Sequence, residues 1–191
     1  MYGNEREVGS AIRDYLTKDP SAKRQDIFYT TKLASNNGYN QSLKSLQTSL
    51  QRCGLDYIDL ILIHSPYDGP HARKESWEAL LEAQKRGWTK SIGVSNYGVK
   101  HLQEMLKQGN KPVVNQVDLH PFMTRTDIVD FSQENDIVLE VISLLTEIEI
   151  GIRSSDKRIP DQASSFIGNC EKVRKNCGAG VDSMGLATRI R

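Results

Sequence analysis

The sequence predicts an α/β protein built on a parallel β-sheet. Short apolar runs rich in β-branched residues alternate with longer segments in which apolar residues recur at helical spacing. The ends of the apolar runs recur at intervals of roughly 23 to 32 residues, as expected for repeated βα units. Because the runs are almost continuously apolar, we expect their strands to be covered by helices on both faces of the sheet.

Five apolar runs are the expected strands. One segment with helical spacing precedes the first run, and one lies between each pair of successive runs. Glycines follow three of the helical segments, at Gly54, Gly87 and Gly109, where a helix commonly ends. The expected strands are 27–31, 58–63, 91–94, 113–117 and 137–141, and the apolar faces of the expected helices lie at 8–16, 43–50, 77–88, 102–106 and 128–131.

Two architectures share this alternation, a closed (β/α)₈ barrel and an open doubly wound sheet. No Gly-x-Gly-x-x-Gly turn joins a strand to a helix, so the usual dinucleotide-binding fingerprint of the open sheet is missing. Polar residues close successive apolar runs, at Lys32, His64, Ser95 with Asn96, and Gln116. Barrel enzymes carry their chemistry at the carboxyl ends of the strands, so the barrel is favoured.

Composition narrows the expected partners and location. The 191 residues carry 25 Lys and Arg against 24 Asp and Glu, a net charge of +1, which predicts neither nucleic acid nor an anionic membrane as a partner. No stretch approaches the ~18 consecutive apolar residues of a membrane-spanning helix. The three cysteines are odd in number and loosely spaced, which favours a reducing, cytoplasmic location. The histidines lack metal-ligand spacing, and no pattern indicates an oligomeric state.

Five motifs, in order over residues 2–143, resemble the aldo-keto reductases. The order makes the resemblance specific, since each motif alone is weak. The motifs begin with Tyr2-Gly3-Asn4-Glu5, Thr30-Thr31-Lys32-Leu33, Asp56-Tyr57-Ile58-Asp59 leading to His64-Ser65-Pro66, Ile92-Gly93-Val94-Ser95-Asn96, and Asn115-Gln116-Val117-Asp118.

The resemblance implies a (β/α)₈ barrel that reduces an aldehyde or ketone with a nicotinamide cofactor, usually NADP(H). Tyr2 matches the general acid, Lys32 the cation that lowers the tyrosine pKa, and His64 the residue that orients the carbonyl substrate. A free tyrosine with a pKa near 10 is a poor proton donor at neutral pH, which is why a neighbouring ammonium group helps it. Ser95, Asn96 and Gln116 match the positions that hydrogen-bond the nicotinamide carboxamide.

The resemblance also predicts an incomplete barrel, with about five of the eight βα units. A complete barrel takes ~250 residues, and the family motifs here end near residue 143. The family's Ile-Pro-Lys-Ser segment, which grips the ribose phosphate of the cofactor, does not appear. Residues 144–191 lack apolar periodicity, so we expect an irregular or disordered tail outside the family.

Two functional interpretations therefore remain open. One is an oxidoreductase that reduces small carbonyl compounds with NAD(P)H. The alternative is a catalytically inactive fragment, or a partial barrel that binds cofactor and has a regulatory role.

Overall fold

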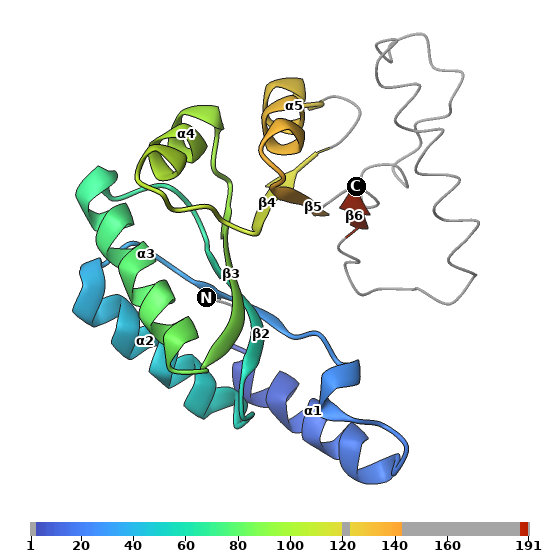
Figure 1. Cartoon of the computed structure of the whole chain (residues 1–191). Helices are drawn as coiled ribbons and strands as arrows, with labels where there is room; N and C mark the ends of the chain where they lie inside the picture. Colours follow the sequence, from blue (N-terminus) through green and yellow to red (C-terminus); the bar gives the residue numbers. More distant parts are fainter. Residues whose placement is uncertain (1–2, 120–122, 143–187, 191) are drawn as a thin grey trace, which may run out of the picture. The chain divides into compact units, whose positions relative to one another are not determined.

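The computed structural model describes residues 3–119, 123–142 and 188–190, and the chain divides into two compact units, Met1–Val114 and Asn115–Arg191. In the first unit, β1 (Thr30–Leu33), β2 (Ile58–Ile63) and β3 (Thr89–Ser95) pair in parallel (Figure 1). The helices of this unit are α1 (Glu5–Lys18), α2 (Gly38–Cys53), α3 (Gly69–Lys85) and α4 (Val99–Lys107). The predicted alternation of helices with parallel strands is confirmed.

The core of the first unit lies where α2 and α3 cover the strands. Every residue of β2 is buried, which agrees with its uninterrupted apolar sequence. The two helices pack side by side (Figure 1). Leu46 of α2 and Leu80 of α3 are buried there. The buried hydroxyl groups of Ser42 and Ser76 lie 3.0 Å apart and join α2 to α3 by a hydrogen bond.

Helix α1 approaches the C-terminal end of α2 at a glycine. A Cβ atom on Gly9 would lie 1.9 Å from the carbonyl oxygen of Cys53, so a larger residue does not fit without a shift of the backbone. The guanidinium group of Arg13 donates hydrogen bonds to the carbonyl oxygens of Cys53 and Gly54. The close approach at Gly9 therefore fixes α1 against α2.

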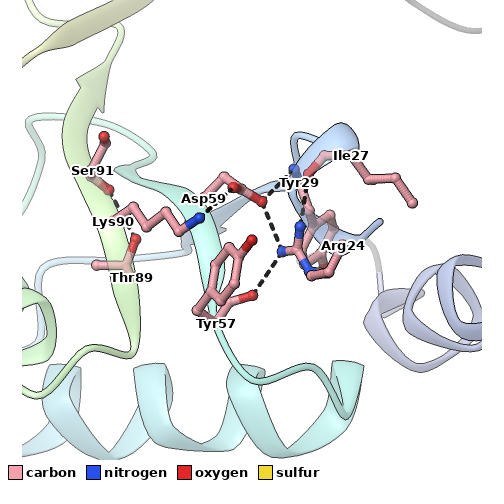
Figure 2. Close-up of polar contacts among 8 residues, drawn as sticks. All are labelled: Arg24, Ile27, Tyr29, Tyr57, Asp59, Thr89, Lys90 and Ser91. Carbon is pink, nitrogen blue, oxygen red and sulfur yellow. Dashed lines mark hydrogen bonds and ion pairs between the residues drawn. The ribbon is translucent and has the colours of Figure 1, made fainter. Parts of the chain in front are cut away.

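A charged cluster ties together the N-terminal ends of the strands (Figure 2). The buried carboxylate of Asp59 pairs with Arg24 at 2.7 Å and also accepts the backbone N–H of Tyr29 at 3.0 Å. Arg24 and Lys90 lie 4.1 Å and 3.7 Å from the centre of the Tyr57 ring, which are cation–π distances. The amino ends of barrel strands usually serve stability, and we assign this cluster to the fold.

The first strand begins later than its sequence predicts. The run 27–31 suggests a strand from residue 27, whereas a short 3₁₀ helix (Arg24–Asp26) precedes it and β1 starts at Thr30. The N–H of Tyr29 bonds to the Asp59 side chain instead of to a strand backbone, and Phe28 is 69 % exposed. The carboxylate of Asp59 thus binds a backbone N–H group that a strand over 27–31 would have used for pairing.

The second unit contains β4 (Val114–Asp118), which begins one residue before the unit, α5 (Thr126–Glu134), β5 (Val138–Ile142) and β6 (Thr188–Ile190). Strands β5 and β6 pair antiparallel, with Leu139 opposite Ile190. Residues 143–187 lie outside the described residues, so the predicted domain boundary near residue 143 and the predicted irregular tail stay predictions.

Candidate active site

Three of the predicted site residues lie at the carboxyl ends of β1, β2 and β3. The parallel register sets Lys32 of β1 opposite Leu62, two residues before His64. It also pairs Ile63 with Val94, which places His64 and Ser95 next to each other in adjacent strand ends. The N–H of His64 continues the pattern by donating to the carbonyl oxygen of Leu33 at 3.0 Å. Lys32, His64 and Ser95 therefore share one edge of the sheet.

Asn96 joins this group through its side-chain amide. Its Nδ2 donates to the carbonyl oxygen of His64 at 2.9 Å and lies 3.2 Å from the hydroxyl oxygen of Ser95. The backbone of Asn96 is left-handed, with a φ of 61°, a conformation that asparagine adopts more readily than most residues. Ser95 is fully buried, whereas Asn96 is exposed. The turn after β3 thus presents an amide side chain beside His64.

The electrostatics of this edge favour a neutral His64. Partial burial and the positive charge of Lys32 both lower the pKa of His64 from its ordinary value, because each disfavours the imidazolium form. A neutral imidazole carries one N–H, so it can donate one hydrogen bond to an oxygen atom of a ligand. Lys32 also lines a cavity of about 270 Å³ beside β1 and α2, which Glu5 and Arg52 line as well.

Gln116 and Tyr2 are the remaining predicted site residues. Gln116 is buried on β4, in the second unit, where its Nε2 donates to the Oε1 atom of Glu140 at 2.7 Å. Tyr2 lies outside the described residues. The structure therefore brings together Lys32, His64, Ser95 and Asn96, and it describes Gln116 within a different unit.

The chemistry of these residues fits a nicotinamide carboxamide. The carboxamide has one donor group and one acceptor group, and hydroxyl and amide side chains can match both. Because the Nδ2 atom of Asn96 is engaged by the fold, its side-chain oxygen is the atom suited to accept from the carboxamide. In the second unit, the bond from Gln116 to Glu140 orients the Gln116 amide in the same way.

Two residues, one in each unit, could not be assigned a role from the sequence. Glu140 breaks the apolar alternation of its strand, and that interruption is the signal that could have identified it as the partner of Gln116. Asn36 is 2 % exposed and bonds to the loop after β2. It belongs to a Ser-Asn-Asn-Gly run that is typical of an exposed turn, so no local signal marks its burial.

The described part of the chain contains neither a metal-binding cluster nor a helix that could span a membrane. Within residues 3–119 and 123–142, no three His, Cys, Asp or Glu side chains gather so that they could hold a metal ion. None of the helices described here has the length and apolarity needed to cross a bilayer.

Comparison with known proteins decides the family. The family model described as "Aldo/keto reductase family" matches residues 1–173. The chain belongs to the aldo/keto reductase family. The match includes every predicted site residue and extends 30 residues past residue 143, near which the family motifs of the sequence end.

Curated relatives of this aldo/keto reductase chain include an oxidoreductase from yeast and a prostaglandin F synthase from cattle. It is 46 % identical to the uncharacterized oxidoreductase YJR096W of Saccharomyces cerevisiae over 151 residues, which cover 76 % of this chain and 54 % of the relative. It is 38 % identical to prostaglandin F synthase 1 of Bos taurus over 167 residues, covering 76 % of this chain and 51 % of the synthase. The chain thus spans about half the length of the curated relatives it matches.

Solved structures show the same fold. The aldo/keto reductase of Brucella melitensis is 35 % identical, with a TM-score of 0.71 over 91 % of this chain and 61 % of that one. The aldo-keto reductase AKR2E5 complexed with NADPH is 28 % identical, with a TM-score of 0.71 over 88 % of this chain and 55 % of its own. The predicted fold class is confirmed: the described residues form four successive βα units and a fifth strand, β5, and solved aldo-keto reductases share this fold.

Proposed function

We propose that this protein is an NAD(P)H-dependent oxidoreductase that reduces small aldehydes or ketones to alcohols by hydride transfer. The observation that carries the proposal is the shared position of Lys32, His64 and Asn96 at the carboxyl ends of three parallel strands. In barrel enzymes this edge is where catalytic residues gather. Family membership supports the same reaction type.

The proposed roles follow from the charge that builds up during reduction. The nicotinamide cofactor, when bound, supplies a hydride to the carbonyl carbon, and negative charge then develops on the carbonyl oxygen. The neutral imidazole of His64 orients that oxygen and stabilises it by donating a hydrogen bond. Tyr2 donates the proton, and the ammonium group of Lys32 lowers the pKa of Tyr2 so that the transfer occurs near neutral pH.

The proposed cofactor is NADP(H), held at its carboxamide by Ser95, Asn96 and Gln116. Support comes from the relative AKR2E5, whose structure contains NADPH, and from the hydroxyl and amide groups at these three positions. The phosphate-gripping segment of the family does not appear in this sequence.

The proposal includes a small carbonyl substrate and a cytoplasmic location. The net charge of +1 supports neither nucleic acid nor a membrane as a partner. Cys53 is a buried free thiol, which suits a reducing compartment.

Cofactor titration is the first test. NADPH added to the full 191-residue chain should quench the fluorescence of its two tryptophans, and a carbonyl compound should then cause oxidation of the NADPH. Binding without any carbonyl-dependent oxidation would favour the regulatory alternative. The absence of binding up to millimolar NADPH would favour the inactive fragment.

A further inference from the structure

The loop that follows β2 is held by side chains at four consecutive carbonyl groups. These are the carbonyl groups of residues 64–67, and each accepts a hydrogen bond from a side chain outside the loop. Asn96 bonds to the carbonyl of His64 at 2.9 Å, Asn36 to those of Ser65 at 2.9 Å and Tyr67 at 2.8 Å, and Arg73 to that of Pro66 at 2.9 Å. The donors come from three different segments of the first unit.

Asn36 makes the largest contribution to this set of bonds. Both of its loop bonds come from one amide nitrogen, Nδ2, whose two hydrogens are thereby used. Its backbone N–H donates a third bond, to the Oδ2 atom of Asp68 at 3.1 Å. Its Oδ1 atom is buried and has no hydrogen-bond partner among the described residues. The hydrogen bonds that the Asn36 side chain makes to the described residues are therefore both donated by Nδ2, to the 64–67 loop.

The loop begins at a proposed catalytic residue and ends at an exposed aromatic residue. His64 opens it and carries the imidazole that the proposed reaction uses. Tyr67 is the last residue of the loop. It is 74 % exposed, and its carbonyl oxygen accepts a hydrogen bond from Asn36. Without these donors, fewer contacts would hold the loop in one conformation, so we expect it to open locally more often.

We propose that Asn36 is a positioning residue: by holding the carbonyls of Ser65 and Tyr67, it keeps the 64–67 loop in one conformation and so fixes the imidazole of His64 for the substrate. This role rests on the proposed function for its catalytic consequence. Its structural part stands on the hydrogen bonds alone. The two parts can therefore be tested separately.

Asn36→Ala in the full chain removes both side-chain donors. The exposed Tyr67 ring offers chymotrypsin a cleavage site, and cutting after it requires the backbone to open locally. Loss of one buried and one partly buried hydrogen bond should increase the opening, so we expect cleavage after Tyr67 to become at least about tenfold faster. Titration of His64 by NMR should show its pKa rising towards the ordinary value near 6.5, because a looser loop hydrates the imidazole.

Gln84→Ala is the matched control. The Nε2 atom of Gln84 also donates to a backbone carbonyl, that of Lys90 at 2.9 Å, but near the amino end of β3. This variant should leave both the cleavage rate and the His64 titration unchanged. Asn36→Ser keeps one shorter donor and should give smaller changes of the same sign as Asn36→Ala.

The outcomes separate the two proposals. Wild-type cleavage and titration in a folded Asn36→Ala protein would overturn the positioning role, and so would failure of both Asn36 variants to fold, since Asn36 would then serve the fold. In an active wild type, Asn36→Ala should lower kcat/KM at least about tenfold while the Kd for NADPH stays the same. An inactive wild type that shows the loop changes would overturn the proposed function and leave the loop assignment standing.

Discussion

The side chain of Asn96 donates a hydrogen bond of 2.9 Å to the carbonyl oxygen of His64, so the turn after β3 is tied to the residue that follows β2. One of these residues is proposed to contact the cofactor and the other the substrate. Their hydrogen bond fixes the distance between the two proposed contacts before any ligand binds. Such preorganisation avoids rearrangement during the reaction, which is how fixed donors accelerate charge development.

Replacing Asn96 should weaken cofactor binding. Asn96→Ala removes the amide that bonds to His64 and that we expect to accept from the carboxamide, and it places alanine in left-handed backbone. The hydrogen bond lost to the carboxamide is worth about 0.5–1.5 kcal/mol, so the Kd for NADPH should rise about two- to thirteenfold in a fluorescence titration. Asn96→Asp keeps an acceptor for the carboxamide but replaces the donor to the His64 carbonyl with an oxygen, so its Kd for NADPH should also exceed that of the wild type. An unchanged Kd in Asn96→Ala would remove this residue from the cofactor site.

Stability should fall as the solution becomes mildly acidic. Burial lowers the folded-state pKa of His64, and the charge of Lys32 adds to the effect. Burial also lowers the pKa of His101, with Arg73 contributing. The unfolded chain then takes up protons first, so this stability is present above about pH 6.5 and is lost as the pH falls towards the folded pKa values. Urea midpoints at pH 7.5 should exceed those at pH 5.5.

The two histidines can be separated by substitution. His64→Gln and His101→Gln should each reduce the difference between the two urea midpoints, and the double variant should reduce it further. Lys32→Met should raise the pKa of His64, as observed by NMR, because a positive neighbour has been removed. A His64 that titrates above 6.5 in the folded wild type would show that the electrostatic description is wrong.

Asp59 should be among the most sensitive residues of the fold. Asp59→Ala leaves Arg24 without its 2.7 Å partner and the N–H of Tyr29 without its acceptor (Figure 2). Removing one partner of a buried pair costs about 3–5 kcal/mol, which urea unfolding would detect. The control is Glu82→Ala, which breaks the more exposed pair with Arg86 and should cost less than about 1 kcal/mol. Equal losses in the two variants would contradict the structural role given to Asp59.

Gly9 should not tolerate a side chain. Alanine is the better helix former by roughly 0.5–1 kcal/mol, yet its Cβ would meet the carbonyl of Cys53. We expect Gly9→Ala to lower the free energy of unfolding by about 1–3 kcal/mol, as overpacking does. Ser10→Ala on the same helix should change it by less than about 0.5 kcal/mol. A more stable Gly9→Ala protein would show that α1 does not pack against α2 as described.

The fold could be predicted from sequence where burial and local pattern agree. Strand β2 (Ile58–Ile63) has the bounds that its apolar run predicts, because every one of its residues is buried. Residues 27–29 break the agreement, since the side chain of Asp59 captures the Tyr29 N–H from about 30 residues away. The local pattern of residues 27–29 carries no information about an acceptor in another segment.

The site could be predicted only in part for a similar reason. Lys32 and His64 follow apolar runs and belong to family motifs, so their positions could be inferred before the structure. Asn36 and Glu140 act through partners that are distant in sequence, at Ser65 and Tyr67 for the first and at Gln116 for the second. Their roles depend on register between strands and loops, which one sequence does not specify.

Transfer of deuterium tests the central claim most directly. The full chain is mixed with NADPH that is doubly deuterated at C4 and with a small aromatic aldehyde, and mass spectrometry measures deuterium in the alcohol. We predict one deuterium on the alcohol carbon for each NADPH oxidised. Tyr2→Phe should slow the transfer at least about 100-fold, the contribution expected of a general acid, with the same Kd for NADPH. Bound NADPH without transfer in the wild type, or an unchanged rate in Tyr2→Phe, would contradict the proposed reaction.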